Sequence, residues 1–130
     1  METWSKYWSE GDAYLKAGIG GWAKTQKFLP EVVFSLGTLA IEAYFLAFLG
    51  NRNRLPEHHT FGHFIRAVSS EKPFPTEVAE VLRKLDLKQN LCDFAPHLSK
   101  PTFWEVELCL NTAQEVRDFL LSLEPEGVRV

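Results

Sequence analysis

The chain has 130 residues, a length that favours one domain with one hydrophobic core. Hydrophobic residues make up 45% of it, which excludes a chain that is disordered throughout. Leucine far outnumbers isoleucine, and glycine and proline are sparse, so the composition favours helices over a β-sandwich. We therefore predict one all-α domain over residues 1–130, an up-and-down bundle of about five helices, with its core between 3 and 123 and a tail at 124–130.

The net charge of −3 argues against nucleic acid or an anionic membrane as a target of the whole surface. The charge is uneven, however, because residues 51–100 hold eight basic and six acidic side chains, whereas residues 101–130 hold two and six. Any polyanion site must therefore lie in the middle of the chain. Cys92 and Cys109 follow no signal peptide, which predicts reduced thiols in a cytoplasmic protein, although counting alone leaves one disulfide open.

Prolines divide the chain into helical segments, because proline is tolerated at helix starts and in connections but not inside helices. The first predicted helix begins near Thr3 and carries large rings at helical spacing, namely Trp4, Tyr7, Trp8 and Tyr14. These rings are either a docking face onto the core or part of a homodimer interface. The glycines at its end, Gly18, Gly20 and Gly21, predict a stop or a bend.

The second predicted helix runs from Glu31 to Leu49, with Gly50 just past its end. It is apolar nearly all round, and a helix of this length can span a bilayer. One interior carboxylate, Glu42, and the helix-weakening Gly37 instead favour the central helix of a bundle, so we expect no membrane association.

Glu42 needs explaining because an isolated buried carboxylate is unfavourable. We expect a structural role in which it pairs with a facing side chain, with His59 and His97 as the candidates. The alternative is that Glu42 lines a groove for a dimer partner or a nucleotide.

Three further helices are predicted. A short one begins near Thr60 and buries Phe61, Phe64, Ile65 and Val68. Thr76 caps the fourth, whose core side holds Val78, Val81, Leu82 and Leu85. The last has a Thr-x-x-Glu capping box at Thr102 and Glu105, and it ends before Pro125.

Four stretches of the chain, taken in order, match the pattern of a known family. They are the run from Ala40 to Gly50 with its embedded Glu42, Leu55-Pro56 followed by His59-Thr60-Phe61, the hexapeptide Gln-Asn-Leu-Cys-Asp-Phe at 89–94, and the amphipathic run from Thr112 to Leu120. Together they resemble the HEPN domain, the higher eukaryotes and prokaryotes nucleotide-binding family, over about residues 10–123. The resemblance implies a helical bundle that binds nucleotide or RNA and pairs with a minimal nucleotidyltransferase in toxin–antitoxin-type operons.

The same resemblance bears on catalysis. Active ribonucleases of the family use an Arg-Asn pair and a His four to six residues after the Arg, but Gln89 stands at the Arg position here. A neutral amide cannot stabilise a negative phosphorane as a guanidinium does. The family's lysine in the second helix likewise reads Leu46. We therefore expect no full ribonuclease motif; under the alternative of a metal-independent, dimeric endoribonuclease, Asn90 and His97 are the catalytic residues, with Arg83 supplying the missing charge.

One basic segment stands out in this acidic chain. It contains Arg52, Arg54, His58, His59, His63 and Arg66 and is opposed only by Glu57. Arginines and the free N–H groups of a short helix beginning near Thr60 can bind a phosphate, whereas the simpler interpretation is a solvated loop. His59 and His63 are spaced to share a metal ion, but no carboxylate pair or Cys-x-x-Cys supports them, so we expect no metal and no cofactor.

The sequence thus predicts a nucleotide-, RNA- or partner-binding module that acts as a homodimer and has a nucleotidyltransferase partner. The predicted ligand-binding residues are Arg52, Arg54, His59, His63, Arg66 and Asp93. Two alternatives remain: the endoribonuclease described above, and a domain that only assembles with a partner and binds no small ligand.

Overall fold

The structure is a computed structural model that describes residues 2–23, 29–94 and 100–124, with no account of the side chains at 2, 3, 23 and 89–94. Five helices fill these ranges, in which no strand occurs. They are α1 (Glu2–Ala23), α2 (Pro30–Asn51), α3 (Phe61–Val68), α4 (Thr76–Phe94) and α5 (Phe103–Ser122). The predicted all-α bundle is confirmed.

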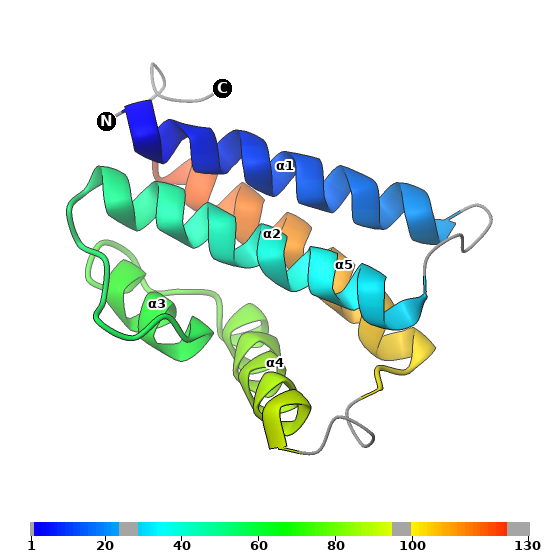
Figure 1. Cartoon of the computed structure of the whole chain (residues 1–130). Coiled ribbons are helices and arrows are strands. Elements are labelled where there is room, and N and C mark those ends of the chain that lie inside the picture. Colours follow the sequence, from blue (N-terminus) through cyan, green and yellow to red (C-terminus); the bar gives the residue numbers. More distant parts are fainter. Residues whose placement is uncertain (1, 24–28, 95–99, 125–130) are drawn as a thin grey trace.

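The long helices α1, α2 and α5 lie side by side, and α3 and α4 pack below α2 and α5 (Figure 1). The core is built around the fully buried rings of α2, among them Tyr44, Phe45 and Phe48. The ring of Phe45 stacks on Phe64 of α3 at 5.0 Å and lies 5.9 Å from Phe74, so it attaches both α3 and the segment before α4 to the central helix.

Both helices that the sequence predicted to stop at glycines run through them. Gly50 lies inside α2, which continues to Asn51. Glycine suits this position because a side chain there would collide with the indole of Trp4. In α1, a Cβ at Gly18 would lie 3.1 Å from Leu110, so this glycine permits close packing of α1 on α5. The predicted helix end before Gly50 is wrong, and a stop at the glycines of α1 is wrong because α1 runs on to Ala23, while the alternative of a bend there stays a prediction.

Two of the predicted caps and the predicted core faces agree with the structure, whereas Thr76 is the first residue inside α4 and not its cap. Thr60 caps α3 by accepting a hydrogen bond from the amide of His63, and Thr102 and Glu105 form the capping box of α5. The predicted apolar positions of α3 are all buried. Of the N-terminal rings, Trp8 is buried against Tyr44 at 5.5 Å, which fits a docking face onto the core.

In the described ranges, α2 alone is long and apolar enough to cross a membrane. Of its most apolar stretch, 67% is buried against the rest of the protein, as in the core helix of a bundle. Among the described residues, the remaining third is partly buried or exposed, and its exposed members include the apolar side chains of Val32 and Leu39.

Candidate functional site

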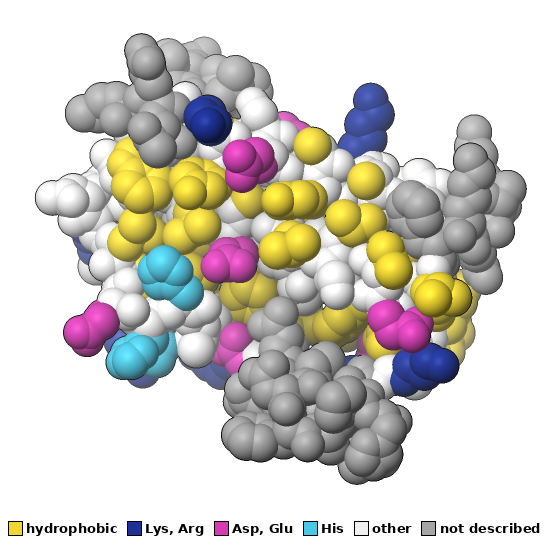
Figure 2. Space-filling model, viewed as in Figure 1, with side chains coloured by type: hydrophobic (Ala, Val, Ile, Leu, Met, Phe, Trp, Pro, Cys, Tyr) yellow, Lys and Arg dark blue, Asp and Glu magenta, His cyan; other side chains and the backbone are white. Residues whose placement is uncertain are grey.

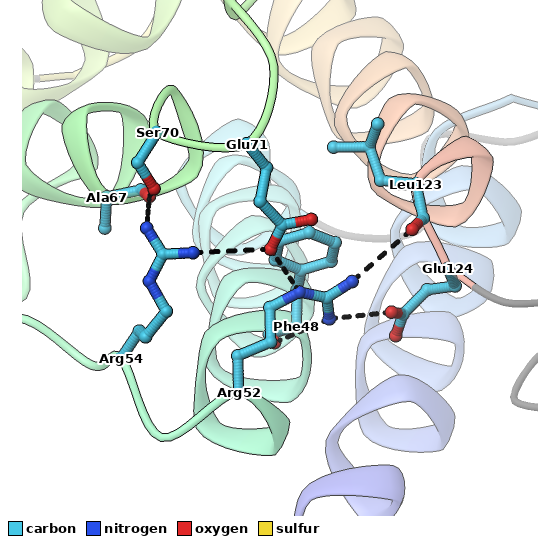
Figure 3. Close-up of polar contacts among 8 residues, drawn as sticks. All are labelled: Phe48, Arg52, Arg54, Ala67, Ser70, Glu71, Leu123 and Glu124. Carbon is cyan, nitrogen blue, oxygen red and sulfur yellow. Dashed lines mark hydrogen bonds and ion pairs between the residues drawn. The ribbon is translucent and has the colours of Figure 1, made fainter.

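Arg52, which follows the last turn of α2, is bound by groups of its own chain (Figure 3). Its Nε pairs with Glu71 in the turn after α3, and its Nη1 lies 2.7 Å from Oε1 of Glu124, just after α5. It donates to the carbonyls of Phe48 at 3.1 Å and Leu123 at 3.4 Å, and it lies 3.6 Å from the centre of the Phe48 ring. Only 16% of its side chain is exposed. Arg52 is therefore a clamp joining three segments, and a phosphate there would have to displace two carboxylates.

Arg54 belongs to the same cluster, as Figure 3 shows. Its Nη1 lies 3.5 Å from Glu71, and its Nη2 donates to the carbonyl of Ala67 at 3.1 Å. With 37% of its side chain exposed, Arg54 is more accessible than Arg52. The basic segment is thus neutralised in part by acids that lie far from it in the sequence.

The N-terminus of α3 is also occupied. The carboxylate of Asp86 on α4 accepts hydrogen bonds from the amides of Phe61 at 2.9 Å and Gly62 at 3.0 Å. The hydroxyl of Thr60 accepts a hydrogen bond from the amide of His63. An anion at a helix N-terminus is stabilised by these amides and by the helix dipole. The expectation of free N–H groups for a phosphate is therefore wrong, because an internal carboxylate already holds them.

Three further predicted ligand residues, His59, His63 and Arg66, lie on α3 or just before it. His63 shares a 2.6 Å hydrogen bond through Nδ1 with Thr60, and the ring of His59 packs 5.4 Å from Phe64. Arg66 is exposed and makes no ion pair with any residue that the structure describes. Nor does the described part of the chain contain a group of three side chains able to hold a metal ion.

The residues predicted for cleavage, Asn90 and His97, and the last predicted ligand residue, Asp93, fall at the edge of what is described. Asn90 and Asp93 lie on the last turns of α4, where only the backbone is described, and His97 lies outside the described residues altogether. Their roles stay predictions.

Glu42 lies at the surface between α1 and α2. Within the described ranges it makes no hydrogen bond or ion pair. The predicted pairing with His59 is wrong, since His59 packs against Phe64 on α3, and the other predicted partner, His97, lies outside the described residues. Instead the carboxylate lines a hollow of about 170 Å³ between the two helices, which matches the alternative of a groove-lining residue.

This hollow belongs to a larger surface, which we call the outer face. It consists of side chains from α1 and α2, namely Tyr7, Glu10, Tyr14, Val32, Leu39, Glu42 and Leu46. Val32, Leu39 and Leu46 recur every seven residues and so share one side of α2. Val32 is 45% and Leu39 42% exposed. Figure 2 shows this side of the molecule, where hydrophobic side chains over α1 and α2 surround a few acidic ones.

A polar network that the sequence did not reveal joins α1, α2 and α5. Asp12 accepts hydrogen bonds of 2.7 Å from the Tyr44 hydroxyl and from Nε of Arg117. Burial opposes the charge on Asp12, but the bonds from Arg117 and Tyr44 outweigh it and lower the pKa of the carboxyl. Burial and the nearby carboxylate raise the pKa of Tyr44. Asp12 and Arg117 also border an open groove of about 590 Å³ between α1 and α5.

Cys109 occupies the core position predicted for it. Its Sγ lies 3.6 Å from the carbonyl of Phe34, and burial raises its pKa to about 12. A thiol that stays protonated and enclosed is a poor nucleophile. The side chain of Cys92 lies outside the described residues.

Comparison of the chain with protein-family models, with curated proteins and with solved structures found no match in any of the three. Its function is therefore inferred from the contacts, burial and charges described above.

Proposed function

We propose that this chain is a non-catalytic, HEPN-like module that binds a partner protein on its outer face. The observation that carries the proposal is the uncovered stripe on α2, where Val32 and Leu39 stay more than 40% exposed on the most apolar helix of the chain. Full burial of each such side chain contributes roughly 1.5–3 kcal/mol. Because Val32 and Leu39 are already more than half buried, a partner helix laid along the stripe gains less than half of that free energy from each.

The charges also favour a protein over a nucleotide. The two arginines nearest the C-terminal end of α2 are paired with Glu71 and Glu124, and the amides of α3 are held by Asp86. The outer face itself carries Glu10 and Glu42, which repel phosphate groups. The HEPN resemblance offers a minimal nucleotidyltransferase as the kind of partner to test first.

The test is a calorimetric titration of the purified chain with any minimal nucleotidyltransferase that an adjacent reading frame encodes. We expect Leu39→Ser to weaken binding at least tenfold, which corresponds to about 1.4 kcal/mol. Leu87→Ser is the matched control, because Leu87 is 65% exposed on α4 and lies outside the outer face. Equal binding by both variants and the unchanged chain would overturn the outer face as the site, as would loss of binding only on substitution of Trp104, which is 76% exposed at the start of α5.

A second candidate function is nucleotide or RNA binding beside α3. It is favoured by Arg66, which is exposed and free of ion pairs in the described ranges, with His58 and His59 exposed nearby. Fluorescence anisotropy with labelled ATP and single-stranded RNA tests it at low and high salt. Binding that Arg66→Ala abolishes supports this candidate, and no binding at millimolar ligand removes it.

A further inference from the structure

The hollow in the outer face has the size of a side chain. Its volume is about 170 Å³, below the roughly 300–1,000 Å³ of pockets that hold drug-sized ligands. It is lined by Tyr7, Glu10 and Tyr14 on α1 and by Leu39, Glu42, Ala43 and Leu46 on α2. We call it the acidic hollow.

The acidic hollow holds two carboxylates and no cation among its lining residues. Glu42 is partly buried, and its neighbour one turn further along α2 is Leu46, which offers it no partner. Within the described part of the chain nothing donates a hydrogen bond to Glu42. Two carboxylates that line one hollow offer a cationic side chain several charged acceptors for hydrogen bonds.

Two tyrosine rings also line the acidic hollow. Tyr7 and Tyr14 lie two turns apart on one side of α1, and both are partly buried against the core. Tyr7 is held in place by stacking on Trp4, with ring centres 5.7 Å apart. Aromatic faces beside carboxylates attract an ammonium or guanidinium group.

We infer that the acidic hollow receives an arginine or lysine side chain of the partner protein, set within an apolar stripe of a partner helix. The inference rests on the proposed function and adds the chemistry of the partner. We take the occupant to be a different chain, because a two-fold contact whose axis passes through the acidic hollow would set Glu10 and Glu42 against the same carboxylates of a second copy.

The test uses peptides that are selected for binding to the chain. A displayed library of helical peptides, with an apolar stripe randomised at its central positions, is selected on the wild-type chain. We expect the recovered peptides to carry arginine or lysine at one central position. Replacement of that cation by citrulline or glutamine should weaken binding at least tenfold on the wild-type chain and have little effect on Glu42→Gln. Glu80→Gln, an exposed carboxylate on α4, is the matched control and should behave as wild type.

Each outcome separates the inference from the proposed function. Recovered peptides without a cation that still lose affinity on Leu39→Ser overturn the cation site but keep the outer face as a protein-binding surface. Peptides insensitive to Leu39→Ser overturn both. A chain that is dimeric by light scattering and becomes monomeric with Leu39→Ser places a second copy on the outer face, and so overturns the cationic partner. Circular dichroism of Glu42→Gln confirms that the variant is folded, since Glu42 has no internal partner to lose in the described ranges.

Discussion

Arg52 and Glu124 form an ion pair of 2.7 Å in which only 1% of the glutamate side chain is exposed. Loss of Arg52 leaves that carboxylate buried without a counter-charge, a situation that destabilises proteins far more than loss of a surface pair. We expect Arg52→Ala to lower the free energy of unfolding by about 3 kcal/mol. Unfolding in urea measures this change in the free energy of unfolding. Arg54→Ala, whose side chain is 37% exposed, should lower it by less than about 1 kcal/mol. Equal effects of the two variants would contradict the clamp.

The network around Asp12 makes stability depend on pH. Because the folded protein lowers the pKa of this carboxyl, its stabilising contribution is present above the ordinary pKa and is lost as the pH falls through the folded value. We expect the wild-type chain to be more stable than Asp12→Asn at neutral pH, with the difference shrinking below about pH 4. Denaturant unfolding at several pH values measures the difference. A difference that is constant or grows on acidification would refute the assignment.

The glycines of the two N-terminal helices should respond oppositely to alanine. A side chain at Gly50 collides with the Trp4 indole, so we expect Gly50→Ala to destabilise the protein by about 1–3 kcal/mol. At Gly20 nothing lies within 4 Å, so Gly20→Ala should raise stability by about 0.5–1 kcal/mol through its better helix propensity. Thermal unfolding of both variants is the measurement. Destabilisation at Gly20 would show that α1 needs a glycine there for another reason.

Cys109 should not react in the folded protein. Its burial and raised pKa of about 12 leave almost no accessible thiolate at pH 8. With Cys92 replaced by serine, we expect Ellman's reagent to label no thiol until denaturant is added. Rapid labelling under native conditions would mean that α5 separates readily from α2.

RNA cleavage tests the remaining alternative. With Gln89 at the position of the family's arginine, we expect no cleavage of tRNA or single-stranded RNA in the absence of metal. Gel electrophoresis of the incubated RNA reads the result. Cleavage that disappears with Asn90→Ala would favour the endoribonuclease over the binding module.

The sequence predicted what depends on neighbouring residues. The five helices, the Thr60 cap and the capping box of Thr102 and Glu105 follow from hydrophobic spacing and from hydrogen bonds within one turn. The ends of α1 and α2 were missed because a glycine that stops a helix and a glycine that admits a neighbouring side chain look alike in one sequence. Gly50 is of the second kind, and its neighbour Trp4 lies at the far end of another helix.

The site was harder to predict because its contacts join distant residues. Nothing near Arg52 indicates Glu71 or Glu124 as its partners, and nothing near Phe61 indicates Asp86. The sequence therefore showed where the basic segment lies, but it did not show that acidic residues of the same chain pair with its arginines. The outer face was missed for a related reason: an apolar helix predicts burial, but only the arrangement of its neighbours tells which side they leave bare.

The Arg52 clamp also bears on the order of events in folding. It connects groups 71 positions apart, between the end of α2 and the carbonyl of Leu123, and so closes a long loop whose ordering is entropically unfavourable. We expect the Arg52 contacts to form late in folding, and contacts absent from the transition state act mainly on the rate of unfolding. Loss of Arg52 should then shorten the lifetime of the folded bundle while leaving its folding rate almost unchanged.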